Sequence, residues 1–257
     1  MPRHLPGAHE LGQNFLRDRR TIDRIVDLVA RADGDIVEWG AGDGALTLPL
    51  SALGRPLEAV EIDPRAVRAL TRRVGAHVTV RRGDILRHAP TPGSTLVSNL
   101  PYHLTTPALR HLLRSDGWSR AVLVTQWEVA RKRAGVGGAT MMTAQWWPWV
   151  ETTLEGRIPA SAFRPRPAVD SGLLLLERRR EPHLARRDRR AYQQFVRGVF
   201  TGPGRGLEQM LRRGGGLPAG AARRFCDRHG YSPRTLPRDV VLAQWVEAFE
   251  LSRTRTG

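Results

Sequence analysis

One cysteine, one lysine and no long apolar run distinguish this sequence of 257 residues. The lone thiol, Cys226, excludes an internal disulfide and any metal site built from several cysteines. A reducing, cytoplasmic compartment therefore suits the chain. No stretch approaches the roughly 20 apolar residues that cross a bilayer, and residues 1–15 lack the apolar core of a secretory signal. We therefore expect neither a membrane protein nor a secreted one.

The basic charge comes almost wholly from arginine. The chain has 41 Lys plus Arg against 25 Asp plus Glu, a net charge of +16, and Lys132 is its only lysine. Guanidinium groups bind phosphate through two parallel hydrogen bonds and stack on bases. The composition therefore favours a polyanionic partner, most simply a nucleic acid. The alternative at this point is that the charge serves solubility alone.

The charge is unevenly distributed along the chain. Residues 1–177 hold 23 basic and 18 acidic side chains, a net charge of +5, whereas residues 178–257 hold 18 and 7, a net charge of +11. The composition changes at the run Arg178–Arg180, directly after an apolar stretch. We expect a larger domain over 1–177 and a smaller, arginine-rich domain over 178–257 that binds nucleic acid. The pattern of the smaller domain predicts helices at 190–200, 207–213, 219–229 and 239–251.

The larger domain alternates short apolar runs with helical stretches. This alternation is typical of an α/β fold with a mainly parallel, Rossmann-like sheet. The predicted strands are 36–39, 57–62, 78–81, 95–98 and 121–125, and the predicted helices are 21–30, 66–74 and 107–114. Two later runs, 149–154 and 172–176, predict a closing antiparallel pair. The fold class is therefore α/β, with a small all-helical C-terminal domain.

A glycine-rich turn, Gly40-Ala-Gly-Asp-Gly44, follows the first predicted strand. Such a turn lets the backbone approach a ligand closely, because no Cβ intervenes. Glu61 ends the next strand, 19 residues beyond Gly42, where a carboxylate normally binds ribose hydroxyls. Asp84 follows the third strand and could accept a hydrogen bond from an adenine amino group. With Ala45 the turn also fits a dinucleotide pattern, so a nicotinamide enzyme and a plain structural corner remain alternatives here.

The stretch Ser98-Asn-Leu-Pro-Tyr102 follows the fourth predicted strand, at the same edge of the sheet. An exocyclic amine of a base is a poor nucleophile, because its lone pair is delocalised into the ring. The Asn99 side-chain oxygen and the Leu100 carbonyl can each accept one N–H bond and so favour a tetrahedral nitrogen. Tyr102 offers a flat face for an extruded base, a contact worth roughly 1–3 kcal/mol. The stretch therefore favours methylation of a base amine, although an ordinary turn is the alternative.

These residues resemble the rRNA adenine-N6 methyltransferases, which include the Erm and the KsgA-type enzymes. The resemblance covers nearly the whole chain, at residues 12–16, 38–47, 61–63, 83–86, 99–102, 126–130 and 163–169. It implies a Rossmann-like methyltransferase domain that uses S-adenosyl-L-methionine, followed by an RNA-binding domain. It implies that the cofactor is held by Asn14, Leu16, Gly40, Gly42, Glu61, Asp84 and Asn99. It also implies that Tyr102 and Phe163 sandwich the flipped adenine, beside Asn99 and Leu100 as catalytic residues.

Within this family the Erm branch is the more similar, notably over residues 9–16, 40–50 and 126–138. Membership of that branch implies methylation of one adenine of 23S rRNA and resistance to macrolide, lincosamide and streptogramin B antibiotics. Gly12 and the 99–102 stretch are KsgA-like, and Trp39 replaces the usual Ile or Val. The alternatives are therefore a KsgA-type enzyme acting on small-subunit rRNA and a relative that binds RNA without catalysis.

The remaining residues carry weaker predictions. Trp146, Trp147 and Trp149 are interpreted as core packing rather than as a platform for RNA bases. The eight histidines show no metal-ligand spacing with supporting carboxylates, so we expect no metal. Cys226 should pack inside a helix without a chemical role. We expect the protein to act as a monomer on ribosomal RNA.

Overall fold

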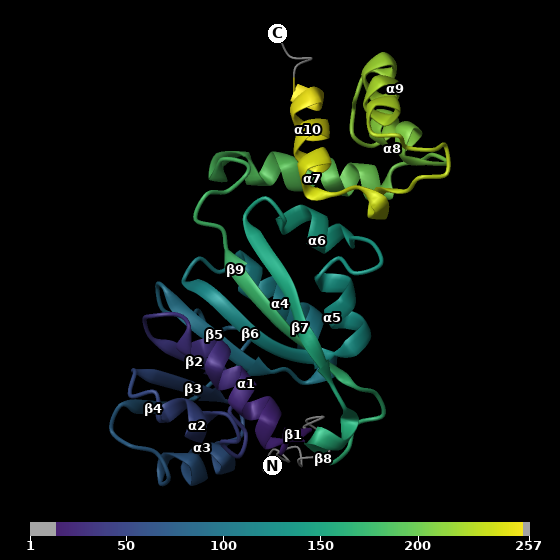
Figure 1. Ribbon diagram of the computed structural model, residues 1–257. Coiled ribbons are helices and arrows are strands. Elements are labelled where there is room, and N and C mark those ends of the chain that lie inside the picture. Colours follow the sequence, from purple (N-terminus) through teal and green to yellow (C-terminus); the bar gives the residue numbers. More distant parts are fainter. Residues whose placement is uncertain (1–13, 254–257) are drawn as a thin grey trace, which may run out of the picture. The chain divides into compact units, whose positions relative to one another are not determined.

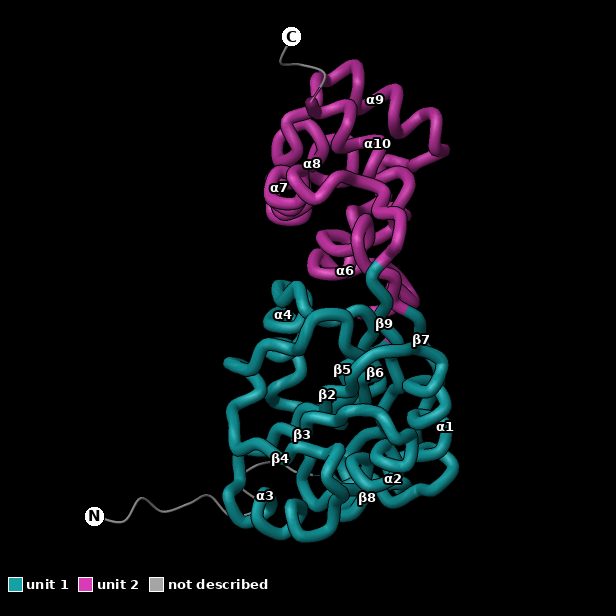
Figure 2. The backbone as a smooth tube through the Cα atoms, turned by 90° about the vertical axis from the view of Figure 1, so that its left-hand side faces the viewer, with its two compact units in different colours: residues 1–130, 153–178 teal, residues 131–152, 179–257 magenta. Residues whose placement is uncertain are grey.

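The computed structural model describes residues 14–253. Gly12 of the predicted motif, and most of residues 1–15, in which we expect no secretory signal, lie outside the described residues. The chain forms two compact units (Figure 2): the residues up to 130 with 153–178, and residues 131–152 with those from 179 onward. One crossing between the units follows Arg178, one residue beyond the boundary predicted after residue 177. Residues 131–152 belong to the second unit, although we expected them in the first domain.

The first unit is built on a seven-stranded sheet with the order β4-β3-β2-β5-β6-β9-β7 (Figure 1). Strands β2 to β6 pair in parallel, and β9 pairs antiparallel with β6. Each predicted strand is present, and the two later runs form the neighbouring strands β9 and β7. The strands are β2 (Ile36–Trp39), β3 (Leu57–Glu61), β4 (Val78–Arg82), β5 (Ser94–Asn99), β6 (Trp118–Gln126), β7 (Val150–Ile158) and β9 (Ser171–Arg178).

Both faces of this sheet are covered, because successive residues along its central strands are all buried. In β5, Leu96 and Val97 point to opposite faces, and both are fully buried. One face packs on α1 through Ile25 and Val29. The helices of this unit, which Figure 1 shows on both sides of the sheet, are α1 (Arg19–Ala30), α2 (Thr47–Ser51), α3 (Pro64–Thr71), α4 (Thr105–Arg114) and the start of α5 (Trp127–Arg133).

Side-chain caps fix where the helices start at the carboxyl edge of the sheet. The carboxylate of Asp18 accepts the N–H of Thr21 at 2.9 Å, at the start of α1. Asp63 accepts the N–H of Arg65 at 2.8 Å, and Pro64 occupies the first position of α3. A short ribbon, β1 (Phe15–Leu16) with β8 (Phe163–Arg164), lies outside the main sheet.

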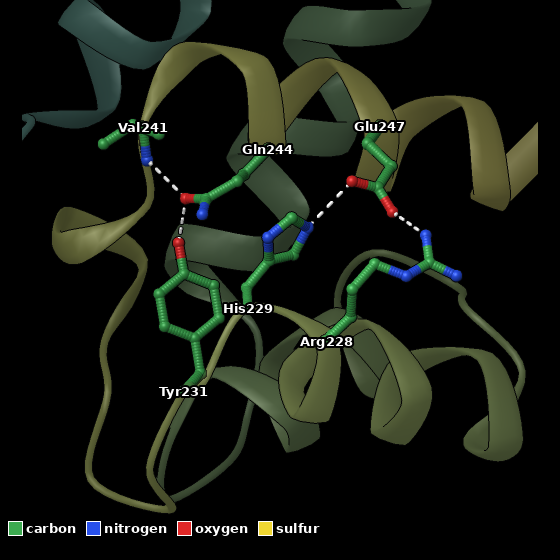
Figure 3. A network of polar contacts seen from close by, with 6 residues as sticks. All are labelled: Arg228, His229, Tyr231, Val241, Gln244 and Glu247. Atoms are coloured by element: carbon green, nitrogen blue, oxygen red, sulfur yellow. Dashed lines mark hydrogen bonds and ion pairs between the residues drawn. The ribbon is translucent and has the colours of Figure 1, made fainter.

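The second unit is helical. Its helices are α6 (Met141–Trp146), α7 (Arg189–Thr201), α8 (Leu207–Arg213), α9 (Ala219–Arg228) and α10 (Leu242–Arg253), and the last four match the predicted helices of the C-terminal domain. Its core is aromatic: the Tyr192 ring meets the Phe249 ring edge-on, with their centroids 5.3 Å apart, and Phe195 packs on Trp245. Polar contacts of Glu247 in α10 with Arg228 and His229 add to the contact between α9 and α10 (Figure 3).

Residues 131–152 join the second unit through specific contacts. The hydroxyl of Tyr192 donates to the carbonyl of Ala144 at 3.0 Å, and the indole N–H of Trp149 donates to the carbonyl of Leu184 at 2.8 Å. Trp149 is buried, which agrees with a core role, whereas Trp146 and Trp147 are partly exposed. Arg189 lies over the Trp146 ring at 5.4 Å.

Within residues 14–253, none of the helices has the length and apolarity required to cross a bilayer. Cys226 lies in α9, and burial raises the pKa of its thiol to about 11, so the thiol stays protonated at neutral pH. Across the same part of the chain, there is no group of three or more His, Cys, Asp or Glu side chains that could hold a metal ion.

Two glycines set the distance between α7 and the end of α8. A Cβ on Gly198 would lie 2.1 Å from the carbonyl oxygen of Gly214, so the backbone would have to move. We expect Gly198→Ala to lower the free energy of unfolding by about 1–3 kcal/mol, although alanine favours helix. Thermal unfolding checks this, with Gln194→Ala on the exposed face of α7 as the control, expected to stay within about 0.5 kcal/mol. Equal midpoints for the two variants would contradict the prediction.

Candidate active site

A cavity of about 310 Å³ opens at the carboxyl edge of β2, β3 and β5. Ligands bind at this edge in open α/β sheets. Its lining includes nine of the predicted site residues, namely Asn14, Leu16, Gly40, Gly42, Glu61, Asp84, Asn99, Leu100 and Tyr102. The structure therefore brings together residues that are up to 88 positions apart in the sequence, from Asn14 to Tyr102.

The glycine turn after β2 has a backbone that other residues adopt rarely. Gly40 and Gly42 have φ angles of 74° and 53°, in the left-handed region. A Cβ on Gly42 would lie 3.1 Å from a ring carbon of Phe15. A Cβ on Gly40 would have no protein atom within 4 Å, so it would occupy space that now belongs to the cavity. The turn therefore forms a surface that a ligand can approach closely.

Glu61 connects the end of β3 to this turn. Its carboxylate accepts the N–H of Gly42 at 2.8 Å through one oxygen and the N–H of Asp63 at 2.9 Å through the other. The side chain is 2% exposed. Each carboxylate oxygen has two lone pairs, so both can still accept a hydroxyl hydrogen bond. The prediction from sequence named the ribose role alone, whereas the structure shows that Glu61 also holds the turn.

Asp84 follows β4 and also lines the cavity. One oxygen of its carboxylate accepts the N–H of Leu86 at 2.9 Å, and the other lies 4.0 Å from the guanidinium of Arg87. The side chain is 41% exposed, so water or a ligand can reach it. Beside it, Ile62 is a large apolar side chain that is 52% exposed and lines the same cavity. The apolar side chain of Ile62 can pack on the face of a flat ring, and the carboxylate of Asp84 can accept a hydrogen bond from a polar group at the edge of that ring.

The stretch from Asn99 to Tyr102 is tied at both ends. The side-chain N–H of Asn99 donates to the carbonyl of Asn14 at 2.7 Å, which sets the orientation of the amide and leaves Oδ1 as its acceptor atom. The Tyr102 hydroxyl is hydrogen bonded to the Ser171 hydroxyl at 2.8 Å. Burial raises the pKa of the Tyr102 phenol, so this group keeps its proton.

A comparison with family models decides what kind of protein this is. The model described as ribosomal RNA adenine dimethylase matches residues 7–247, nearly the whole chain. The chain belongs to this family. Its sheet, its cavity and the 99–102 stretch are therefore those of an rRNA adenine dimethylase family member.

Individual relatives agree with this assignment. The mycinamicin-resistance protein MyrB of Micromonospora griseorubida is 48% identical over 250 residues, 96% of this chain and 79% of that protein. An rRNA adenine N-6-methyltransferase of Corynebacterium diphtheriae is 48% identical over 81% of this chain and 83% of that protein. The crystal structure of the 23S rRNA methyltransferase ErmE matches with a TM-score of 0.84 and 33% identity, over 92% of this chain and 98% of that one. The predicted Rossmann-like fold and the resemblance to Erm-type enzymes are confirmed.

One predicted residue of this family member does not reach the cavity. Phe163 is fully buried, and β8 places it opposite Leu16 of β1, inside the main hydrophobic core. Of the two rings expected to sandwich the adenine, the structure places Tyr102 in the cavity lining and Phe163 outside it. Stacking of Phe163 on the adenine stays a prediction.

Trp39, the departure from the family pattern, packs behind the glycine turn rather than in the cavity. Its ring is 1% exposed and stacks on His111, with the centroids 5.5 Å apart. Its indole N–H donates to Nδ1 of His88 at 3.0 Å, and Nε2 of His88 is 3.1 Å from the carboxylate of Glu58. Two histidines thus accommodate the larger side chain.

Glu38 is a lining residue that sequence reasoning missed. It is the third residue of β2, 2% exposed, and the hydroxyl of Thr47 donates to its carboxylate at 2.6 Å. Burial raises the pKa of Glu38 to about 8, and the neighbouring carboxylates of Glu61 and Asp43 add to the shift. The available signal was an acidic residue inside an otherwise apolar strand directly before the glycine turn.

The raised pKa of Glu38 makes stability depend on pH. Between the ordinary value of 4.5 and about 8, the folded chain keeps a proton that the unfolded chain releases. The free energy of unfolding therefore falls as pH rises through this window, by up to about 1.4 kcal/mol per pH unit. Glu38→Gln cannot titrate, so we expect its thermal midpoint to fall less than that of the wild type between pH 5 and 8. Glu181→Gln, at an exposed glutamate, is the control and should follow the wild type; parallel profiles for Glu38→Gln would contradict the prediction.

Proposed function

We propose that this protein methylates N6 of one adenine of 23S rRNA with S-adenosyl-L-methionine, and that the modification confers resistance to macrolide, lincosamide and streptogramin B antibiotics. The observation that carries the proposal is the convergence of Asn99, Leu100 and Tyr102 on the cavity that Gly40, Gly42 and Glu61 also line. The names of MyrB and ErmE support the Erm-type reading. A methylated amine would crowd the drug site on the ribosome and remove a hydrogen-bond donor.

The lining of the cavity fits the cofactor. The space in front of Gly40 admits a chain such as that of methionine, and Asn14 and Leu16 would close it from the N-terminal side. Glu61 would accept bonds from the ribose hydroxyls, and Asp84 would accept one from the adenine amino group while Ile62 packs on the ring. S-adenosyl-L-methionine supplies an electrophilic methyl group when it is bound.

Asn99 and Leu100 would activate the target amine. The amide orientation set by Asn14 leaves Asn99 Oδ1 to accept one N–H of the amine, and the carbonyl of Leu100 would accept the other. Two acceptors in these positions localise the lone pair of the nitrogen and direct it away from the ring. The amine becomes acidic only after it gains the methyl group, so catalysis consists mainly of positioning and charge stabilisation.

Arginines provide the binding energy for RNA. In the second unit, Arg212 and Arg213 are exposed at the end of α8, and among residues 14–253 neither has an ion-pair partner within 4 Å. By contrast, Arg228 pairs with Glu247 at 2.6 Å and Arg253 with Asp188 at 2.9 Å. In the first unit, an open groove next to the β1–β8 ribbon is lined by Arg20 and Arg164, and by Arg17, which pairs with Asp43 at 2.5 Å. Such side chains bind phosphates without reading sequence.

The direct test is transfer of a radiolabelled methyl group to protein-free 23S rRNA and, separately, to 16S rRNA, followed by mass mapping of the product. We expect label on one adenine of 23S rRNA. Label in 16S rRNA instead would show a KsgA-type enzyme acting on the small subunit. Absence of label in both would show a relative that binds RNA without catalysis.

Removal of the side-chain acceptor tests the role of Asn99. We expect Asn99→Ala to lower kcat by about 100- to 1,000-fold, the cost of one positioned polar group at a reacting centre. Thermal unfolding should show an intact fold. Calorimetric titration with S-adenosyl-L-methionine separates cofactor binding from the chemical step. A kcat within a few-fold of the wild type would contradict the activation role.

Phosphate contacts are tested by the salt dependence of RNA binding. We expect Arg212→Gln/Arg213→Gln to weaken RNA binding and to reduce the slope of log K against log salt concentration. Each lost contact should remove about 0.7–0.9 from the slope. Arg228→Gln/Arg253→Gln removes the same net charge but from arginines that already pair with carboxylates, so its slope should change less. If both double variants give the wild-type slope, these arginines serve solubility.

A further inference from the structure

The Tyr102 hydroxyl has a partner that no catalytic role requires. Its hydrogen bond to Ser171, 2.8 Å long, crosses 69 positions of the sequence and joins the η1 turn (Tyr102–Leu104) to the first residue of β9. Tyr102 lines the cavity and is half-buried, whereas Ser171 is fully buried and does not line it. The bond therefore reaches from a cavity residue into the sheet behind it.

Ser171 is itself held rigidly. It lies opposite Gln126 in the antiparallel pair of β6 and β9. The preceding residue, Asp170, is fixed by three bonds: its backbone carbonyl accepts the N–H of Trp127 at 2.9 Å, and its carboxylate accepts the N–H of Ala160 at 2.8 Å and the guanidinium of Arg157 at 2.7 Å. The anchor of the Tyr102 hydroxyl is thus part of the sheet and of the segment that leads into it.

We propose that Ser171 is a positioning residue, which fixes the ring of Tyr102 so that its face meets the target base beside Asn99. This inference rests on the proposed function. A hydrogen bond that fixes the tyrosine oxygen restrains the first side-chain torsion directly. That oxygen lies on the axis of the second torsion, so the ring face is restrained through the direction of the bond, because the phenol O–H prefers the plane of the ring. Asn99 is tied to Asn14 at the other end of the same stretch. The two bonds together keep constant the spacing between the amide acceptor and the ring.

The arrangement also defines what the Tyr102 hydroxyl does. The hydroxyl is engaged with Ser171, so the contribution of Tyr102 to the base comes from the face of the ring. Tyr102→Phe keeps this face and loses only the restraint. Ser171→Ala removes the same restraint from the buried side. The two substitutions should therefore have the same effect, for the same reason.

A double-mutant cycle tests this. We expect Ser171→Ala and Tyr102→Phe each to lower kcat for 23S rRNA by about 2- to 10-fold, the range of one net hydrogen bond. The KM for RNA and the affinity for S-adenosyl-L-methionine should stay within about 2-fold, because phosphates and the cofactor bind elsewhere. The double variant should be no slower than the slower single variant, since both substitutions remove one interaction.

A second hydroxyl pair supplies the control. Thr105 and Thr125 are fully buried in the same unit and hydrogen bonded at 2.9 Å, and neither lines the cavity. Thr125→Val should lower the thermal midpoint as Ser171→Ala does, but its kcat should stay within about 2-fold of the wild-type value. This separates loss of stability from loss of positioning. If Ser171→Ala folds poorly, Tyr102→Phe, at a half-buried residue, still tests the restraint.

The outcomes distinguish this inference from the function on which it rests. An active wild type whose kcat is unchanged in Tyr102→Phe would overturn the role of Ser171 and leave the methyltransferase intact. Multiplicative losses in the double variant would also overturn it, because the two residues would then act separately. A wild type that methylates neither rRNA would overturn the proposed function itself, and this inference with it.

Discussion

The buried carboxylate of Glu61 is the contact on which the cavity depends. Backbone N–H groups of Gly40 and Ala41 already join the loop after β2 to the carbonyl of Val60 in β3, and the Glu61 side chain extends this connection further into the loops. Glu61 accepts the N–H of Gly42 from the loop after β2 and the N–H of Asp63 from its own loop. A carboxylate that is 2% exposed is stable only with such partners. The residue that would bind the ribose thus first shapes the surface on which the ligand would lie.

The loop after β5 is likewise held by hydrogen bonds from its own side chains. Asn99 and Tyr102 each use one polar atom for a hydrogen bond to the protein. The remaining part of each side chain is available to a ligand in the cavity. For Asn99 the amide nitrogen is engaged and the oxygen remains an acceptor. For Tyr102 the hydroxyl is engaged and the ring face remains. Both anchors lie in other segments, at Asn14 and Ser171, so the loop has its geometry before any ligand binds. Catalysis by positioning gains its rate from such preformed geometry.

Much of this was predictable from sequence because the determining signals are local. The strands of the first unit follow from short apolar runs, and the cavity follows from glycines and carboxylates at successive strand ends. What could not be predicted depends on contacts between distant segments. The burial of Phe163 comes from pairing with Leu16, and the transfer of residues 131–152 to the second unit comes from contacts such as Tyr192 with Ala144. Pattern and spacing contain no information about either.

The carboxylates of the cavity explain why a neutral amide, rather than an acid or a base, faces the target amine in this scheme. Of the four carboxylates that line it, Glu38 accepts from Thr47, Asp43 pairs with Arg17 at 2.5 Å, and Glu61 and Asp84 accept backbone N–H groups. A carboxylate beside the amine would gain nothing as a base, because the amine does not release a proton until it is methylated. It would also repel the phosphates of the RNA that must approach. A neutral acceptor next to the amine adds no further negative charge to a cavity that four carboxylates already line.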